Sequence, residues 1–385
     1  MTMRRIMPKV IGVAIIVIAF FLTSTPMGRV SIKTTLFTAH LIPNTPVSPL
    51  EILSKSPTSQ KISFKTSNGK PASADLYLPH GNNKHPAVIF FMGVMPPNRN
   101  DERIIRMTEG LARSGTIVLV PWLETQNDQR IVKGDIDALV DAYHFLESHN
   151  RVLPKKIGFA GICTGASIAT IAAQDPAIRH KVYFLNSFAG YFDAKDLIKA
   201  VSTNTKFYKG TFEDWIPDGL TTSLVNQHLI YGASEKDKRI LEKILSNGYW
   251  TKNDQNSISP QGQATLNIIS GSDLVNVDEA IENLPNRTKK DLEEISPSTN
   301  VANLHTKVLL MHDSSDMLIP SEESKRFADE LSKLGRDVYH TEFTFFKNVL
   351  EVHKSENETT DISSLVTQAF KLYLHMYNVM WLLSQ

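Results

Sequence analysis

The only cysteine of the chain lies in a short motif whose residue types could perform nucleophilic catalysis. Residues 161–165 read Gly-Ile-Cys-Thr-Gly, the form of a nucleophile elbow with cysteine where serine usually stands. Small residues on both sides of the nucleophile allow a strand and a helix to approach closely. We therefore interpret Cys163 as a nucleophile. The alternative is a buried cysteine that acts as a small apolar side chain.

The sequence on both sides of the motif supports this interpretation. Residues 156–160 are predicted to form a short buried strand, and a helix is predicted to begin near residue 167. Strand, turn and helix are the context that an elbow needs. A thiol attacks a carbonyl only as the thiolate, and its unperturbed pKa is about 8.5. A base must therefore lie within reach, and a carboxylate must orient that base.

Candidates for both partners follow Cys163 in the order nucleophile, acid, histidine. Asp316 lies in a loop after a predicted strand and is our candidate acid; Asp313 competes with it but lies nearer the strand end. His353 lies between the last predicted strand and the final helix, where the base is expected. His340 and His375 fall within that strand and that helix and are the structural alternatives. For Asp316 the alternative is a turn or capping role, and for His353 a solvated loop histidine.

An oxyanion hole for this chemistry needs two backbone N–H groups. The residue after the nucleophile, Thr164, is expected to supply one. Val94 is the candidate for the other, because it follows Gly93 in the loop after the predicted strand at residues 87–92. The next prolines, Pro96 and Pro97, have no N–H and cannot serve.

Alternating buried strands and helices are expected to position these residues. This pattern predicts an α/β fold, with a mostly parallel sheet covered by helices on both faces. A hairpin is predicted at residues 59–79. Strands are predicted at residues 87–92, 116–121, 156–160, 181–186, 307–312 and 337–345, and helices at 100–114, 135–150, 321–334 and 362–383. The core is thus expected to comprise residues 59–190 and 305–385.

Residues 191–304 interrupt the strand–helix rhythm with polar, helix-like sequence. We interpret them as a lid over the carboxyl edge of the sheet, where open α/β folds bind ligands. Its Trp215, Tyr249 and Trp250 are candidates for the walls of a substrate site. The alternative is that these aromatic residues pack within the lid's own small core.

Residues 1–25 resemble a targeting segment. Arg4, Arg5 and Lys9 precede an apolar run of 13 residues from 10 to 22, which is short for a membrane span. We expect an extracytoplasmic protein that is held on the membrane by this segment, or secreted after its cleavage. A buried core helix is the alternative. Residues 26–58 are rich in Ser, Thr and Pro and are interpreted as a linker.

Composition excludes several other functions. The 41 basic and 40 acidic residues of the 385 give a net charge of +1, so no nucleic-acid partner is expected. A single cysteine cannot form an internal disulfide, and we find neither a metal-ligand cluster nor a phosphate-binding glycine loop. No cofactor or metal is therefore expected. The sequence gives no indication of the oligomeric state.

Together these residues resemble the dienelactone hydrolase family of the α/β-hydrolases. The resemblance is carried by the cysteine elbow, by residues 312–320 with Asp316, by His353, and by the opening strand at residues 74–79. It implies an α/β-hydrolase fold and a cofactor-free hydrolase that cleaves a small-molecule ester or lactone through an acyl-enzyme. An acyltransferase that uses the same thioester, and a non-catalytic binding protein on a hydrolase scaffold, are the alternative functions.

Overall fold

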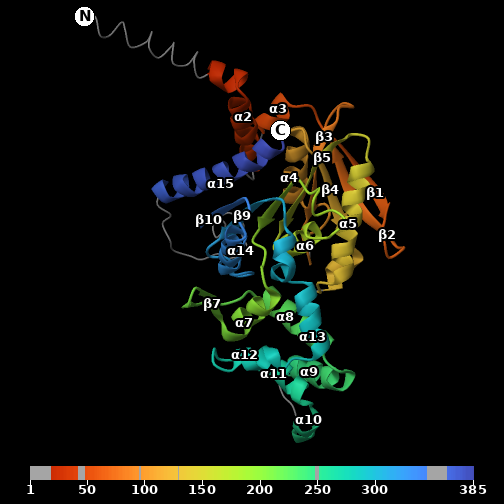
Figure 1. Cartoon of the computed structure of the whole chain (residues 1–385), viewed down its shortest axis with the longest axis vertical. Coiled ribbons are helices and arrows are strands. Elements are labelled where there is room, and N and C mark those ends of the chain that lie inside the picture. Colours follow the sequence, from red (N-terminus) through yellow and green to blue (C-terminus); the bar gives the residue numbers. More distant parts are fainter. Residues whose placement is uncertain (1–18, 42–47, 95–96, 129, 248–250, 345–361) are drawn as a thin grey trace, which may run out of the picture.

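An eight-stranded mixed sheet forms the centre of the molecule in a computed structural model that describes residues 19–41, 48–94, 97–128, 130–247, 251–344 and 362–385 (Figure 1). The strand order is β1-β2-β4-β3-β5-β6-β9-β10. β2 is antiparallel to both of its neighbours, and all other pairs are parallel. The strands are β1 Thr58–Lys65, β2 Pro71–Leu78, β3 His85–Phe91, β4 Ile117–Trp122, β5 Val152–Ile162, β6 Phe184–Phe188, β9 Lys307–Asp313 and β10 Val338–Phe343.

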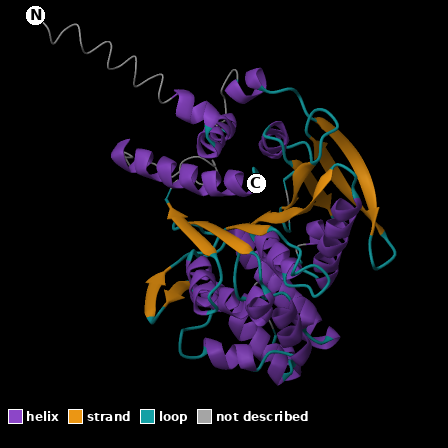
Figure 2. Ribbon diagram, turned by 45° about the horizontal axis from the view of Figure 1, so that its top comes forward, coloured by secondary structure: helices purple, strands orange, loops and turns teal. Residues whose placement is uncertain are grey.

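Helices cover both faces of this sheet (Figure 2). α5, α6 and α14 contribute to one apolar core, and α2, α4 and α15 contribute to the core on the other face. The bounds of the helices are α2 Pro26–His40, α3 Pro49–Leu53, α4 Glu102–Arg113, η1 Glu124–Asp128, α5 Lys133–Ser148, α6 Thr164–Ala173, α14 Glu322–Lys333 and α15 Ile362–Leu382. This architecture confirms the predicted α/β-hydrolase fold.

The two cores follow from the alternation of side chains along the buried strands. In β3, Ala87 and Ile89 point into one core, whereas Val88 and Phe90 point into the other. All four are buried. A strand buried on both faces reads as a continuous apolar run, and this explains why the central strands were predictable.

The prediction that residues 26–58 form a linker is wrong, because this segment contains two helices that belong to the fold. Residues 26–40 form α2, which packs against α15 and α4, and α3 follows it. Val30 and Phe37 of α2 are buried in the core on that face of the sheet. The linker was predicted from the many Ser and Thr residues of this segment. In the helix the hydroxyls of Thr34 and Thr38 donate to carbonyls four residues earlier, so these residues are accommodated within it.

Residues between β6 and β9 form a separate layer of helices below the sheet in Figure 1. They have apolar clusters of their own, and they include a small β-hairpin that was not predicted. We call this layer the lid. Its elements are α7 Ala194–Thr203, β7 Thr205–Tyr208, β8 Thr211–Asp214, α8 Gly219–Gly232, α9 Glu235–Asn247, α10 Lys252–Ser257, α11 Pro260–Ile269, α12 Val277–Glu282, α13 Asn286–Glu294 and η2 Pro297–Asn303.

Within the described ranges, no helix combines the length and the apolar character that crossing a membrane requires. Most of the predicted N-terminal targeting segment lies outside the described residues, which begin at residue 19.

Candidate active site

Cys163 occupies a sharp turn between β5 and α6. Its backbone has φ 54° and ψ −134°, a conformation that costs energy for any residue other than glycine. Neighbouring elements hold the turn in place. The Cys163 N–H donates to the Phe188 carbonyl of β6 (2.9 Å), and the Ala166 N–H donates to the Cys163 carbonyl (2.9 Å). A strained nucleophile between a strand and a helix is the geometry expected of an elbow.

The glycines of the motif are required by close backbone contacts. A Cβ on Gly161 would lie 2.6 Å from the Ala166 Cα. A Cβ on Gly165 would lie 2.4 Å from both the Gly93 nitrogen and the Phe91 carbonyl oxygen. No side chain fits at either position without movement of the backbone. These contacts press the elbow against the end of β3, which carries the predicted oxyanion loop.

Burial strongly disfavours the charged form of the Cys163 thiol. Burial, with a smaller contribution from the Asp316 carboxylate, raises the pKa of the thiol to about 12, while the Thr164 N–H acts in the opposite direction. At neutral pH the thiol is therefore protonated unless a base removes its proton. The electrostatic effect of Asp316 also indicates that the predicted acid lies on the same side of the sheet as the thiol.

Asp316 lies in the loop after β9, and backbone N–H groups hold one of its carboxylate oxygens. Oδ1 accepts from the N–H groups of Leu318 (2.7 Å) and Ile319 (3.3 Å). Oδ2 is 3.5 Å from the Nε2 of His312. That nitrogen already faces the Ile319 carbonyl oxygen at 2.9 Å, so His312 supports the loop. Oδ2 accepts no hydrogen bond from the part of the chain that the structure describes, so it could orient a catalytic histidine.

The competing acid, Asp313, is the last residue of β9 and is buried. Its Oδ1 accepts from the backbone N–H (2.8 Å) and the hydroxyl (2.7 Å) of Ser315. These bonds fix the start of the loop in which Asp316 lies.

The predicted base, His353, lies outside the described residues, so its role stays a prediction. The alternative His375 is a structural residue. Its Nε2 lies 2.8 Å from Oδ1 of Asn186 on β6, and its Nδ1 lies 3.0 Å from the hydroxyl of Thr341 on β10. His340 is within β10 as expected, and burial lowers its pKa.

The two residues predicted to form the oxyanion hole lie side by side. The Val94 N–H donates to the Thr164 hydroxyl at 3.1 Å. Gln126, which the sequence did not single out, donates from Nε2 to the Gly93 carbonyl at 2.7 Å and so fixes this loop. An oxyanion must displace the Thr164 hydroxyl to reach the Val94 N–H. The assignment of both N–H groups to the hole remains a prediction.

A narrow apolar cavity of about 70 Å³ lies between Cys163 and the lid. Its core side includes Val94, Cys163 and Thr164, and its lid side includes Leu220, Leu224 and His228 of α8. These three residues of α8 are four apart and therefore share one face of the helix. That spacing is visible in the sequence, but only the fold shows that this face meets Cys163.

His228 stands out among the polar side chains of this cavity. Thr221 donates to the Leu318 carbonyl (2.8 Å), and Tyr191 donates to the Ile295 carbonyl (2.9 Å). The His228 ring has no hydrogen bond to any residue that the structure describes. Burial lowers its pKa to about 4, so the ring is neutral at pH 7. It can offer a neutral imidazole to a ligand in the cavity.

Of the three aromatic residues predicted to form the walls of a substrate site, only Trp215 lies within the described residues. Trp215 does not line the cavity beside Cys163; the ring is buried in the lid's core, and its Nε1 donates to the Asp316 carbonyl at 2.8 Å. Its contacts thus assign it to support of the acid loop, which differs from the predicted role. Tyr249 and Trp250 lie outside the described residues.

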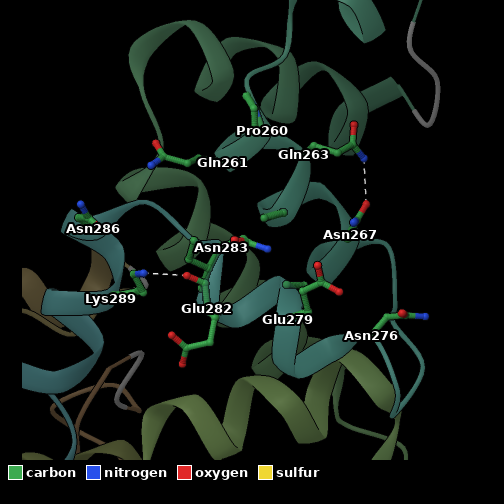
Figure 3. Close-up of a pocket in the computed structure, with 13 residues that line it drawn as sticks. Pro260, Gln261, Gln263, Asn267, Asn276, Glu279, Glu282, Asn283, Asn286 and Lys289 are labelled. Carbon is green, nitrogen blue, oxygen red and sulfur yellow. Dashed lines mark hydrogen bonds between the residues drawn. The ribbon is translucent and has the colours of Figure 1, made fainter.

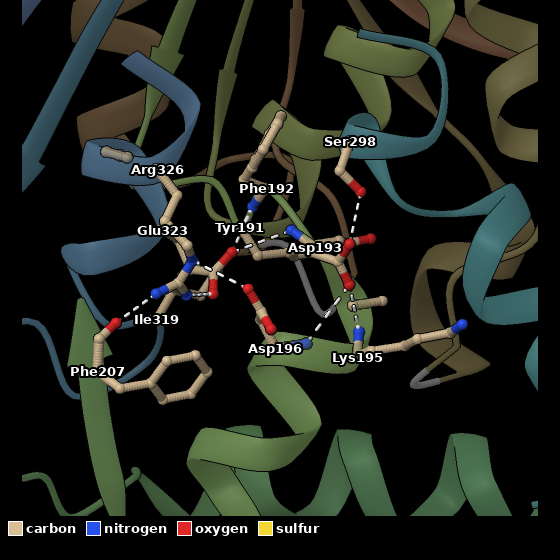
Figure 4. A network of polar contacts seen from close by, with 12 residues as sticks. Tyr191, Phe192, Asp193, Lys195, Asp196, Phe207, Ser298, Ile319, Glu323 and Arg326 are labelled. Carbon is tan, nitrogen blue, oxygen red and sulfur yellow. Dashed lines mark hydrogen bonds and ion pairs between the residues drawn. The ribbon is translucent and has the colours of Figure 1, made fainter. Parts of the chain in front are cut away.

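A buried polar network joins the lid to the core (Figure 4). The Glu323 carboxylate of α14 accepts from the N–H groups of Phe192 (2.7 Å) and Asp193 (3.0 Å). It also pairs with Arg326, which forms a second ion pair with Asp196 of α7 (3.0 Å). The segment that leads into the lid is therefore fixed to a core helix.

A second and larger cavity, of about 540 Å³, lies within the lid (Figure 3). It is lined by α11, α12 and α13, with carboxamides such as Gln263, Asn267 and Asn283, and it contains none of the candidate catalytic residues. We therefore place the candidate active site at the cavity beside Cys163. No three His, Cys, Asp or Glu side chains of the described ranges are grouped in a way that could hold a metal ion.

Comparison with known sequences finds no matching family model. A curated relative from Bradyrhizobium sp., a probable 2-oxo-3-(5-oxofuran-2-ylidene)propanoate lactonase, is 31% identical over 116 residues. The match covers 28% of this chain, which spans less than half of the relative's length (45%).

Among solved structures, the chain is similar to the acylaminoacyl peptidase of Pyrococcus horikoshii. The TM-score is 0.49 at 14% identity, over 86% of this chain and 42% of the peptidase. It is also similar to the Pyrobaculum calidifontis esterase, with a TM-score of 0.46 at 12% identity over 91% of this chain and 92% of the esterase. At these values neither structure indicates a reaction for this chain.

Proposed function

We propose that this chain, a member of the α/β-hydrolase superfamily, hydrolyses a carboxylic ester or lactone through an acyl-enzyme on Cys163. The observation that carries the proposal is the strained elbow conformation of Cys163 at an apolar cavity, with Asp316 held on a neighbouring loop. A merely structural cysteine has no need of a strained backbone with positive φ. The similarity to a lactonase sequence supports the same class of substrate.

In the proposed mechanism, His353 takes the proton of the thiol, and Asp316 orients and stabilises the imidazolium that results. The thiolate sulfur attacks the carbonyl carbon, and the Thr164 and Val94 N–H groups stabilise the oxyanion. The C–O bond then breaks, and the imidazolium returns the proton to the leaving alkoxide. A water molecule, deprotonated by the same histidine, attacks the thioester carbonyl carbon; the C–S bond breaks, the acid is released, and the imidazolium returns the proton to the Cys163 thiolate.

Basic side chains near the outer part of the cavity favour a substrate with a negative group. Tyr231, one turn beyond His228 on α8, has Arg130 3.3 Å and Arg287 5.3 Å from its ring centroid. Arg130 also acts electrostatically on His228, and its chain neighbour Ile131 lines the cavity, so Arg130 lies near the cavity. We propose that a carboxylate on the substrate lies toward Arg130 while the ester carbonyl faces Cys163.

Turnover of chromogenic esters and of simple lactones by the full chain tests the proposed reaction. We expect hydrolysis that disappears in Cys163→Ala, with the fold retained by circular dichroism. Single turnover should leave a thioester on Cys163, which mass spectrometry detects as one acyl adduct per chain. Undiminished turnover by Cys163→Ala would overturn the proposal.

The cavity residues can be tested separately with substrate pairs. His228→Ala should raise KM several-fold with a smaller change in kcat, because the imidazole contacts the substrate and not the reacting bond. Arg130→Gln should raise KM only for esters that carry a carboxylate. Lys238→Gln is the matched control, because its nitrogen lies 5.4 Å from the same Tyr231 ring on the next helix. An equal loss with neutral and acidic esters would contradict the role given to Arg130.

We also propose that the N-terminal segment holds the protein at a membrane outside the cytoplasm. The support is its sequence, with basic residues before a short apolar run.

A further inference from the structure

The first half of α15 exposes apolar side chains along one line of the helix. Val366 is 62% exposed, Phe370 59% and Leu374 36%. Because these residues are four apart, they form a continuous stripe. Figure 1 shows this half of the helix projecting beyond the edge of the sheet. We call Val366, Phe370 and Leu374 the α15 stripe.

Other exposed apolar side chains lie at the same end of the molecule. Phe20 is 69% and Met27 57% exposed, at and just before the start of α2. α2 packs directly against α15, and the hydroxyl of Tyr373 reaches the Ser31 carbonyl at 3.5 Å. In Figures 1 and 2 both helices lie on the side of the sheet opposite the lid. An exposed apolar surface of several neighbouring large side chains marks an interaction site in soluble domains.

The charges of these two helices are all of one sign. α2 carries Arg29 and Lys33, and α15 carries Lys371. Neither helix contains an aspartate or glutamate. The chain as a whole has nearly equal numbers of acidic and basic residues, so the lack of acidic residues in these two helices sets them apart. Exposed apolar residues together with basic ones are typical of helices that lie on an anionic membrane surface.

Aromatic side chains continue along α15 beyond the stripe. The rings of Tyr373 and Tyr377 are 6.5 Å apart, and those of Tyr377 and Trp381 are 6.2 Å apart, between centroids. All three are partly exposed. Tyrosine and tryptophan favour the interface between lipid and water, because one end of each side chain is apolar and the other polar.

We propose that α2 and the α15 stripe form a surface that rests on a lipid bilayer containing anionic headgroups. The α15 stripe would enter the headgroup region, and Arg29 and Lys371, which are exposed, would face the phosphates. Lys33 lies deeper, with its Nζ donating to the Ser384 hydroxyl. This contact would hold the lid and the cavity beside Cys163 on the side away from the bilayer. The proposal stands independently of the hydrolase reaction, and of whether the N-terminal segment also inserts.

Fluorescence of a label placed on the stripe tests this contact in the full chain. In a Cys163→Ser background, Phe370→Cys carries an environment-sensitive dye, and Leu245→Cys on the lid is the control (46% exposed). On addition of phosphatidylcholine vesicles with phosphatidylglycerol, we expect the Phe370 label to shift to shorter wavelength and the Leu245 label to stay unchanged. Vesicles of phosphatidylcholine alone should give a smaller shift.

A second measurement does not depend on labels. Replacement of both Val366 and Phe370 by serine should weaken vesicle binding by about tenfold, because less apolar surface moves from water into the bilayer. Leu245→Ser should leave binding unchanged. The proposal is overturned if the chain binds vesicles while the Phe370 label stays in water. The proposal is also overturned if that label is shielded from water before vesicles are added, because the stripe is then covered by the chain itself or by a second copy. Light scattering, which measures the oligomeric state, separates these two cases.

Discussion

At the scale of single residues, the candidate nucleophile, Cys163, is held in its protonated, unreactive form. Burial raises the pKa of the Cys163 thiol to about 12, so almost none of it is thiolate at neutral pH. The strained backbone nevertheless aims the residue at the cavity. We interpret this state as the resting form, in which a base must act at the moment of attack. This differs from thiols that rest as a preformed ion pair with histidine.

The rate at which iodoacetamide modifies Cys163 should report this resting state. A raised pKa means that the thiolate fraction keeps rising with pH, so the rate should increase about tenfold per pH unit from about pH 6 to about pH 10. Glutathione, measured alongside, should level off above its own pKa. A plateau for Cys163 below neutral pH would show an ion pair already formed and contradict our interpretation. Mass spectrometry should find one label per chain, since there is one cysteine.

The sharp turn at Cys163 and the loop that carries Asp316 were predictable as local structure, because each is encoded within a few consecutive residues. The glycines around Cys163 and the segment around Asp316 carry their own local geometry. His228 was not predictable, because its role depends on how α8 is folded back over the elbow. Trp215 was noticed for its size, but its partner, the Asp316 carbonyl, lies 101 positions away in the chain.

At the scale of elements, the junction of β3, β5 and α6 leaves no room for an additional atom at Gly165. Gly165→Ala should therefore lower the free energy of unfolding by about 1–3 kcal/mol or more, the range for overpacking, and should displace the oxyanion loop. Gly134→Ala in α5 is the control, because nothing lies within 4 Å of the added Cβ. It should change stability by at most about 1 kcal/mol, toward stabilisation. Urea unfolding of both variants checks this; equal effects would refute the contact argument.

Acid should weaken the attachment of α15 through His375. Burial lowers the pKa of His375 to about 3, whereas an unfolded chain protonates this residue near pH 6.5. As the pH falls from about 6.5 toward 3, the unfolded state takes up the proton first. Stability is then lost at up to about 1.4 kcal/mol per pH unit. His228, with a pKa near 4, adds to the same trend.

The variant His375→Gln should remove part of this pH dependence while lowering stability at pH 7. Urea unfolding near pH 7.5 and near pH 4.5 measures both effects, with His144→Gln on the exposed side of α5 as the control. An unchanged difference between the two pH values would exclude His375 as a source of acid sensitivity.

The central strands and the helices between them followed directly from the sequence, because burial on both faces demands long apolar runs. α2 did not. It packs against α15, more than 300 residues later, and its many Ser and Thr residues are typical of a loop. The β7–β8 hairpin was also missed, since its eight residues are half-buried or exposed and show no apolar alternation.

At the scale of the whole molecule, lid and core are joined by buried charge as well as by apolar contact. Glu323 is fully buried, and its removal would leave the Arg326 guanidinium without one of its two carboxylate partners. Glu323→Ala should thus cost about 3–5 kcal/mol of stability. Glu330→Ala, on the same helix but in a surface pair with Lys333, should cost less than about 1 kcal/mol. Thermal unfolding of the two variants tests the difference, and similar melting temperatures would contradict it.

The hydrogen bond from Trp215 to the Asp316 carbonyl couples the position of the lid to the position of the loop that carries Asp316. By reciprocity, whatever favours closure of the lid favours the placement of the acid by the same free energy, and the reverse holds too. A cavity of about 70 Å³ is well below the several hundred that a bound ligand usually occupies, so entry of a substrate requires the lid to move. An empty, open molecule would then have a loosened acid together with an exposed thiol. In the proposed hydrolase, the thiol and the acid would then be placed for reaction only when the lid closes over a bound substrate. Compounds that do not allow closure would not be cleaved.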